Sequence, residues 1–365
     1  MSLWHKAIPI LALALLGATL AVPAGPLLTA ASALVLLAAV LAAVHHAEVV
    51  AHRVGEPYGT LVLALAVTAI EVALIVSMMM ASGPAKAALA RDTIYATVMI
   101  ISSGVIGICV LLGGLRHREQ SFRIEGAGPA LAAFTALATL VLIMPVFTTS
   151  APGASYSTTS APGASYSTTQ LIFVAASSLL VWCAFVFFQT VRHRDYFLPA
   201  TEASNEAVHA PPPSNSESWI SFGLLLVALV AVFGLAKAIS PAIERAVANA
   251  GAPPAVVGII IAMVVLLPES VSAIRSALAN RLQTSMNLAF GSALASIGLT
   301  IPVVVAVAVL LDLPIVLGLQ PKDMVLLVLS LVVCSIGLGN GRTNMMQGAV
   351  QVVIFAAFLF LSLVP

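Results

Sequence analysis

The stretch Gly55–Met80, GEPYGTLVLALAVTAIEVALIVSMMM, decides the fold. It opens on a Gly-x-Pro-x-Gly pattern and continues as an apolar run of membrane-spanning length, with one carboxylate, Glu71, in its middle. A charged side chain at the centre of a membrane helix costs at least about 2.5 kcal/mol, so it is seldom present without a function. We therefore expect Glu71 to take part in the activity.

A second stretch, residues 252–270, has the same arrangement in the second half of the chain. Its sequence is APPAVVGIIIAMVVLLPES, and its carboxylate is Glu269. Glu71 follows Pro57 by 14 residues, and Glu269 follows Pro254 by 15. At 1.5 Å per residue, each carboxylate lies about 21–22 Å along its helix, which is near the middle of the bilayer.

The composition places the whole chain in a membrane. Of its 365 residues, 61% are hydrophobic and 8% are charged, whereas about a quarter of the residues of a soluble domain are charged. The sequence predicts an all-α polytopic membrane protein embedded in the lipid bilayer. A net charge of +1 does not suggest a nucleic-acid partner. No catalytic motif such as His-Glu-x-x-His or Gly-x-Ser-x-Gly occurs within a span, so we expect neither an enzyme nor a bound cofactor.

The hydropathy pattern predicts about eleven transmembrane helices. Their expected ranges are 7–23, 27–50, 58–82, 92–114, 128–147, 170–191, 219–239, 254–278, 285–311, 322–338 and 345–364. The first range has a cationic start and small residues after it, so a cleaved signal peptide is the alternative to a retained helix.

The spans divide into two sets of five after the extra first helix. Because five is odd, the second set enters the membrane with the opposite orientation, which gives the inverted repeat found in many transporters. In such folds the substrate site lies at the midplane between the repeats. The predicted divisions are a first helix (1–26), repeat 1 with helices 2–6 (27–191), a cytoplasmic linker (192–218) and repeat 2 with helices 7–11 (219–365).

The loops alternate in their content of Lys and Arg. Ten of these residues lie on one side and five on the other, which predicts a cytoplasmic N-terminus and a C-terminus on the opposite side of the membrane. The ten are Lys6, Arg53, Arg116, Arg118, Arg123, Arg192, Arg194, Arg275, Arg281 and Arg342, and the five are Lys86, Arg91, Lys237, Arg245 and Lys322.

The paired carboxylates suggest how a transporter could work. Two buried carboxylates facing each other raise each other's affinity for protons. They would hold protons until a cation that prefers oxygen ligands, such as Ca²⁺, displaces them. Glu71 and Glu269 are therefore the candidate sites for both the proton and the metal ion. The alternative is that each Glu is neutralised by a local hydrogen bond and only fixes packing.

Several other polar residues could support the pair as ligands or as a proton relay. For each hydroxyl, a hydrogen bond to a carbonyl of its own helix is the competing interpretation. A zinc site at His45, Glu48 and His52, which share a helical face, is a further alternative. The supporting candidates are Thr68, Ser272, Asn287, Ser292, Ser296, Ser102, Ser103, Glu48 and Glu244.

A ten-residue segment, TTSAPGASYS, occurs at 148–157 and again without change at 158–167. Its residues are typical of turns and flexible linkers, so we expect it to lengthen a loop and assign it no function.

The chain resembles the bacterial calcium/cation–proton exchangers of the CAX type, within the Ca²⁺/cation antiporter superfamily, and among these the ChaA-like branch. The resemblance covers most of the chain. It implies eleven helices, an inverted five-helix repeat and exchange at Glu71 and Glu269. It rests on VGEPYGTLVLALAVTAIEVALIVSMM at 54–79, GGLRHREQSF at 113–122, LLPES at 266–270 with MNLAFGSALASIGLTIPV at 286–303, and GRTNMMQGA at 341–349.

The chain departs from the family pattern beside both carboxylates. Typical members have Gly-Asn-x-x-Glu there, whereas Asn is missing before both Glu71 and Glu269. Fewer oxygen ligands weaken the case for strict Ca²⁺ selectivity, and the ChaA-like branch is also associated with Na⁺ and K⁺. We expect a Ca²⁺/H⁺ antiporter, with a Na⁺(K⁺)/H⁺ antiporter as the alternative and a cation channel as a weaker one. The sequence does not indicate the oligomeric state.

Overall fold

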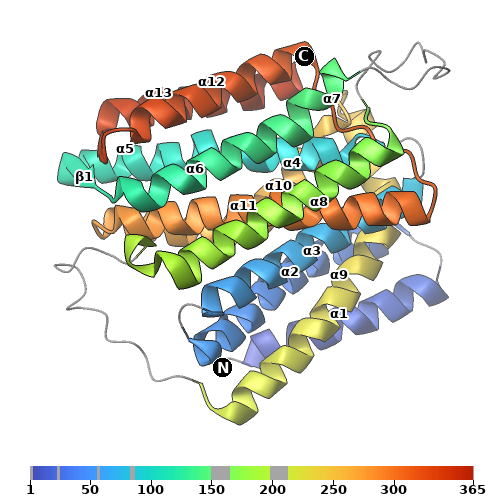
Figure 1. The fold of residues 1–365 in the computed structure, drawn as a ribbon. Helices are drawn as coiled ribbons and strands as arrows, with labels where there is room; N and C mark the ends of the chain where they lie inside the picture. Colours follow the sequence, from blue (N-terminus) through green and yellow to red (C-terminus); the bar gives the residue numbers. More distant parts are fainter. Residues whose placement is uncertain are drawn as a thin grey trace. The chain divides into compact units, whose positions relative to one another are not determined.

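The computed structural model describes residues 3–22, 25–55, 58–82, 87–148, 165–197 and 213–364. Pro57, most of the duplicated segment and the middle of the 192–218 linker lie outside these ranges. The described chain is largely helical (Figure 1). Within it, eleven helical segments are long and apolar enough to span a membrane, which confirms the predicted number.

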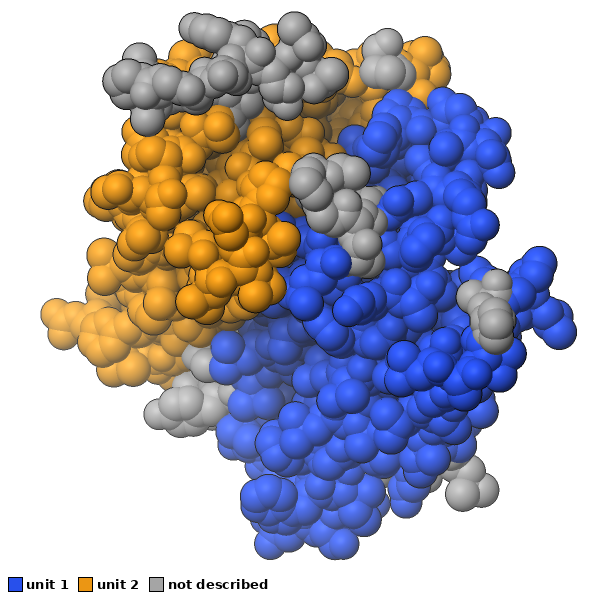
Figure 2. Space-filling model, turned by 90° about the vertical axis from the view of Figure 1, so that its right-hand side faces the viewer, with its two compact units in different colours: residues 1–86, 208–268 blue, residues 87–207, 269–365 orange. Residues whose placement is uncertain are grey.

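The chain folds into two compact units, which Figure 2 colours separately. Unit 1 is formed by Met1–Lys86 and Val208–Pro268. Within it, α2 packs against α1, α3 and α9, and α9 also contacts α1 and α3. Its helices are α1 (Leu3–Ala21), α2 (Pro26–Val54), α3 (Tyr58–Ser82), α9 (Asn215–Asn249) and the first part of α10 (Ala255–Leu278).

Unit 2 is formed by Ala87–Ala207 and Glu269–Pro365. Three of its spans contain a short π-helical segment (η2, η3 and η4), and η5 is a 3-10 helix. Besides the second part of α10, its elements are α4 (Leu89–Met99), η2 (Ile100–Val105), α5 (Ile106–His117), β1 (Glu119–Ser121), α6 (Ile124–Ala138), η3 (Thr139–Ile143), α7 (Met144–Phe147), α8 (Thr168–Phe187), η4 (Phe188–Arg192), η5 (Arg194–Phe197), α11 (Leu282–Leu310), α12 (Pro321–Leu338), β2 (Arg342–Asn344) and α13 (Met345–Leu363).

Each unit draws helices from both repeats. Unit 1 combines helices 2 and 3 (α2, α3) with helix 7 and the start of helix 8 (α9, α10), and unit 2 combines the remaining helices of each repeat. In unit 2, α5 packs on α13 and α11 packs on α8. In the order of the spans, these are contacts of helix 4 with helix 11 and of helix 9 with helix 6. Helix 4 of repeat 1 corresponds to helix 9 of repeat 2, and helix 6 corresponds to helix 11, so the two contacts are equivalent. The two repeats follow each other along the sequence, whereas each compact unit contains helices from both repeats.

Helix α9 is longer than the predicted span 219–239. It begins after Ser214, whose side chain forms a reciprocal capping box with Glu217, and it continues through Pro241 to Asn249. Proline lacks an amide proton but is tolerated within membrane helices when the surroundings compensate for the lost hydrogen bond. The predicted span therefore ended ten residues before the end of the helix.

A two-stranded sheet joins the ends of α5 and α13. β1 pairs antiparallel with β2, with Glu119 opposite Asn344 and Ser121 opposite Arg342 (Figure 1 shows β1 between α5 and α6). The central residue of each strand is buried, whereas the outer residues are exposed. The sheet therefore fixes the register of two spans that are far apart in the sequence.

The end of the duplicated segment has a structural role that we did not predict. Ser167 caps α8 in a capping box with Gln170, and the Tyr166 hydroxyl donates a hydrogen bond of 2.7 Å to the Leu140 carbonyl. Burial raises the pKa of the Tyr166 phenol, which keeps it protonated as a donor. The second copy thus anchors the start of α8.

Glycines allow close approach of α5 and α13. A Cβ atom added at Gly348 would lie 2.3 Å from the Leu111 amide nitrogen and 2.9 Å from the Gly107 carbonyl oxygen. Both neighbours are backbone atoms, which cannot move aside as a flexible side chain can. Small residues at such positions are typical of membrane helix packing.

We predict that Gly348→Ala destabilises the protein, because the added methyl group overlaps the backbone of α5. Overpacking of this kind costs about 1–3 kcal/mol. The measurement is the apparent melting temperature of the purified protein in detergent. Gly291→Ala is the matched control, since nothing lies within 4 Å of a Cβ atom there. Equal melting temperatures for the two variants would contradict the close packing of α5 and α13.

Candidate functional site

Glu71 lies at the midpoint of its span. The apolar window of α3 runs from Val62 to Met80, and only 1% of Glu71 is exposed. Thr68, one turn earlier, is also buried. Within unit 1, α3 packs against α2 and α9. The structure therefore places this carboxylate and its nearest predicted supporter in the interior of the protein.

Glu269 is the second buried carboxylate, with 8% of its surface exposed. It follows Pro268, which lies inside α10 and has no amide proton to donate to the carbonyl four residues earlier. Pro268 ends the part of α10 that belongs to unit 1, and Glu269 begins the part that belongs to unit 2. Glu71 therefore belongs to unit 1 and Glu269 to unit 2.

Ser272, the predicted supporter of Glu269, is exposed. It lies three residues beyond Glu269 on α10 but does not share its buried surroundings. From the helical spacing we expected Glu269 and Ser272 to lie on the same face of α10. In the structure the boundary between the buried and the exposed surface of α10 passes between them. The role of Ser272 as a ligand beside Glu269 stays a prediction.

Ser102 and Ser103 take part in a chain of buried hydroxyl groups. They lie in the π-helical segment η2 and each approaches Ser330 Oγ of α12 to 2.6 Å, while Ser102 Oγ donates to the Val98 carbonyl at 2.7 Å. Because a hydroxyl carries one proton, the donors must run from Ser103 to Ser330, then to Ser102 and finally to Val98. Ser330 was not identified from the sequence, since a single serine in an apolar span gives no signal of its partner.

The polar residues of α11 occupy different surroundings. Ser296 is buried and Ser292 is half-buried. Asn287 Nδ2 donates to the Phe197 carbonyl at 2.6 Å, and Asn287 Oδ1 accepts from Gln283 at 2.9 Å. The structure thus gives Asn287 a role in holding η5, near the start of the linker.

Glu48 and Glu244, the matched carboxylates of α2 and α9, lie on more open parts of unit 1. Glu48 is exposed, and Glu244 is half-buried. Glu244 Oε1 accepts a hydrogen bond of 3.0 Å from Ser240. This placement is compatible with a relay near the ends of the spans, which stays a prediction.

The histidines of α2 pack against α1. The His45 ring stacks on His5 with centroids 3.7 Å apart, and His46 Nε2 lies 3.0 Å from the His5 carbonyl oxygen. Among the described residues, no group of three or more His, Cys, Asp or Glu side chains could hold a metal ion. The alternative of a zinc site at His45, Glu48 and His52 is therefore not supported.

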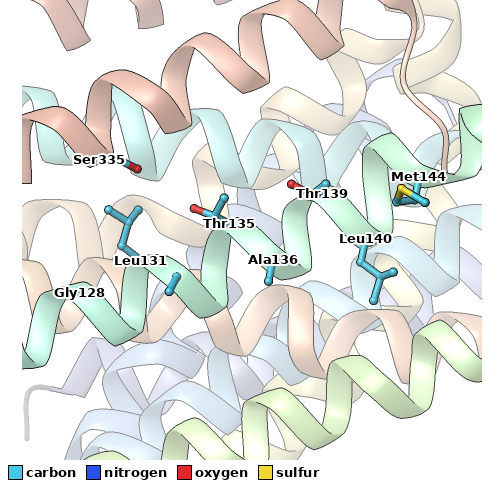
Figure 3. A pocket seen from close by; sticks show the side chains of 9 residues that line it. Gly128, Leu131, Thr135, Ala136, Thr139, Leu140, Met144 and Ser335 are labelled. Atoms are coloured by element: carbon cyan, nitrogen blue, oxygen red, sulfur yellow. The ribbon is translucent and has the colours of Figure 1, made fainter.

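A groove of about 710 Å³ lies along α6, η3 and α7, with α12 at one side (Figure 3). Its lining is mostly apolar, with Thr135, Thr139 and Ser335 as the hydroxyl-bearing residues. None of the predicted site residues lines it. It is therefore distinct from the candidate ion-binding residues.

Comparison with known proteins identifies relatives over nearly the whole chain. Residues 24–191 and 220–364 match the family described as "Sodium/calcium exchanger protein". The putative ionic transporter y4hA of Sinorhizobium fredii is 46% identical over 92% of this chain and 88% of its own length. The sodium-potassium/proton antiporter ChaA of Escherichia coli is 36% identical over 89% of this chain and 85% of its own length.

The fold also matches a solved structure. The Ca²⁺/H⁺ antiporter protein YfkE superposes with a TM-score of 0.70, covering 99% of both chains at 16% sequence identity. The predicted architecture of eleven membrane helices with an inverted repeat is thus confirmed at the level of the fold.

We predict that Ser330→Ala lowers the thermal stability of the protein. The change removes the acceptor of Ser103 and the donor to Ser102, and a buried polar group left without its partner costs about 1–3 kcal/mol. The apparent melting temperature in detergent should fall by several degrees.

Ser335→Ala on the same helix is the control for this prediction. Its hydroxyl bonds to the Leu331 carbonyl of its own helix, so its loss should change the melting temperature little. A decrease as large as that of Ser330→Ala would contradict a specific contribution of the hydroxyl chain between η2 and α12 to stability.

Proposed function

Because the chain belongs to the sodium/calcium exchanger family of antiporters, we propose that it exchanges cytoplasmic Na⁺ or K⁺ for protons across the bacterial inner membrane. The observation that carries this proposal is the burial of two carboxylates, Glu71 and Glu269, within membrane-spanning helices. We assign to these residues the binding of both the cation and the proton.

The proposed mechanism is competition for the carboxylate oxygens. A buried carboxylate favours its neutral form, so it holds a proton when no cation is bound. A cation supplies the positive charge that stabilises the ionised form, and the proton is then released. If the site opens alternately to the two sides of the membrane, this competition couples outward movement of cations to inward movement of protons. The two repeats supply one carboxylate each.

Two observations favour monovalent cations as the substrates. The relative that is named as a sodium-potassium/proton antiporter is 36% identical, whereas the named Ca²⁺/H⁺ antiporters are 25% identical or less. The residues before Glu71 and Glu269 also lack the amide oxygen that an Asn would add. Because Ca²⁺ takes six to eight oxygen ligands, a reduced ligand set favours an ion of lower charge.

Ca²⁺, which the sequence led us to expect as the principal substrate, becomes the second candidate. The observation in its favour is that each repeat carries a buried carboxylate, Glu71 or Glu269, and carboxylate oxygens are preferred ligands of Ca²⁺. Hydroxyl oxygens such as that of the buried Thr68 would be suitable additional ligands.

The proposed direction of transport is set by the proton gradient, and the proposed orientation concerns only the sides on which the termini lie. The excess of Lys and Arg in the loops that follow the even-numbered spans supports a cytoplasmic N-terminus and a periplasmic C-terminus. Outward export of cations then uses the proton gradient of the inner membrane. A cation channel of the same architecture is the rival, and it differs because its ion flux does not require protons.

We predict that Glu71→Gln and Glu269→Gln each abolish exchange in proteoliposomes. Glutamine keeps the size and a polar oxygen but cannot ionise, so it neither binds a proton at this site nor neutralises a cation. The measurement is the collapse of a preset pH gradient when Na⁺ or K⁺ is added. Glu125→Gln is the control, since Glu125 is exposed at the start of α6. A folded Glu71 variant with full exchange would overturn the proposed site.

Cation preference is tested by a matrix of transport assays over cation and pH. We expect Na⁺ and K⁺ to drive proton movement, and the cation concentration at half-maximal rate to rise as pH falls, because protons compete for the same oxygens. Exchange driven by Ca²⁺ alone would favour the second candidate. Cation flux that is indifferent to the pH gradient would support the channel.

A further inference from the structure

One end of unit 2 carries an unusual concentration of arginines. Eight lie where α5, η4 and α10 end and where α6, α11 and α13 begin, and three carboxylates, Glu119, Glu125 and Asp195, lie among them. We call the eight the arginine collar: Arg116, Arg118, Arg123, Arg192, Arg194, Arg275, Arg281 and Arg342.

Hydrogen bonds join the segments of the collar into one surface. The Gln120 side chain in β1 donates to the Ala277 carbonyl at the end of α10 at 2.8 Å. The Arg123 amide donates to Gln283 Oε1 of α11 at 2.7 Å, and Arg123 also bonds to the Asp195 carbonyl. The β1–β2 pairing adds the segment of Arg342. These hydrogen bonds therefore hold the arginine-bearing segments together at the same end of unit 2.

The collar is exposed, and its eight arginines outnumber the three carboxylates among them. Seven of the eight residues are exposed, and Arg123 is half-buried. In the part of the chain that the structure describes, none of the eight forms an ion pair with a carboxylate. The recorded pair, Arg91 with Asp92 at 2.8 Å, belongs to the other end of unit 2.

The excess of positive charge is greatest at this end of unit 2, since at the far end of α9 in unit 1 Lys237 and Arg245 are accompanied by Glu244. The described residues at its opposite end are Arg91 and Lys322 with Asp92, Asp312 and Asp323. At the end of unit 1 that bears the start of α1, Lys6 and Arg53 are balanced by Glu48 and Glu217. The positive-inside rule, which sets the orientation of the spans, does not require the positive charges to be concentrated at one end of one unit.

The choice of residue is informative as well. The positive-inside rule counts Lys and Arg alike, but none of the chain's four lysines, Lys6, Lys86, Lys237 and Lys322, lies among the described residues at this end of unit 2. The guanidinium group binds phosphate oxygens through two parallel hydrogen bonds, whereas the lysine ammonium acts as a point charge. Because the collar surrounds the ends of membrane spans, the phosphates within its reach are those of lipid headgroups.

We propose that the arginine collar binds the phosphate headgroups of anionic phospholipids. This interaction is separate from ion exchange at Glu71 and Glu269 and does not depend on the direction of transport. It would tie the ends of six helices of unit 2 to the surface of the bilayer.

The test uses the full chain in nanodiscs of phosphatidylcholine mixed with phosphatidylglycerol. Native mass spectrometry of the protein released from them measures which lipid stays bound. We expect retention of phosphatidylglycerol over phosphatidylcholine. In R116Q/R342Q the apparent affinity for phosphatidylglycerol should fall by about fivefold for each arginine removed.

The matched control is K237Q/R245Q, which removes two exposed positive charges from α9 in unit 1. It should retain phosphatidylglycerol as the unaltered protein does. An equal loss in both double variants, or equal retention of the two lipids by the unaltered protein, would overturn the proposal.

Two further experiments refine the test. One asks whether binding requires paired hydrogen bonds or only positive charge, and the other asks whether the ligand is a lipid headgroup or a soluble anion. R116K/R342K keeps the charges but lacks the paired donors, and it should bind less phosphatidylglycerol than the unaltered protein and more than R116Q/R342Q. Inorganic phosphate added to the protein in detergent should not displace the lipid. Displacement by phosphate would instead indicate a site for a soluble anion and would contradict the proposed lipid interaction.

Discussion

A carboxylate inside the hydrocarbon layer cannot keep an uncompensated charge, and the proposed activity of this protein depends on that constraint. Glu71 lies at the midpoint of an apolar window and is almost fully buried, and Glu269 is buried after a proline in α10. Such a group is stable when it holds a proton, when a cation is bound, or when polar groups surround it. The proposed exchange uses the first two of these states in turn.

The same constraint explains how the remaining polar groups are arranged. Ser102, Ser103 and Ser330 donate in one direction to the Val98 carbonyl, so that each hydroxyl proton has an acceptor within the membrane-spanning part. The arginines, in contrast, lie at the ends of spans, where water and headgroups are within reach. Because each compact unit combines helices from both repeats, equivalent helices of the two repeats contribute equivalent contacts, as α5 with α13 and α11 with α8.

Much of the architecture could be predicted because hydrophobicity over a span is a property of the chain itself. The number of spans, the inverted repeat and the burial of Glu71, Glu269 and Thr68 follow from apolar length and helical period. The end of α9 was misplaced because hydropathy marks the apolar part of a helix, whereas α9 continues through the more polar residues up to Asn249. Local sequence patterns therefore predict whether a segment forms a helix better than they predict where the helix ends.

The neighbours of individual side chains could not be predicted in the same way. Ser330 bonds to Ser102 and Ser103, Asn287 bonds to the Phe197 carbonyl, and His45 stacks on His5. Each contact joins residues distant in sequence, and helical spacing shows only which face a residue occupies. Ser272 shows the limit on a single helix, since it lies one turn from the buried Glu269 and is exposed.

The most direct measurement is proton release on cation binding by the purified protein in weakly buffered detergent solution. The proposed competition predicts that Na⁺ or K⁺ displaces protons into solution, detected with a pH-sensitive dye, and that a Glu71→Gln/Glu269→Gln protein releases none. Binding of the cation without release of protons would contradict the account, because cation and proton would then not share the carboxylates.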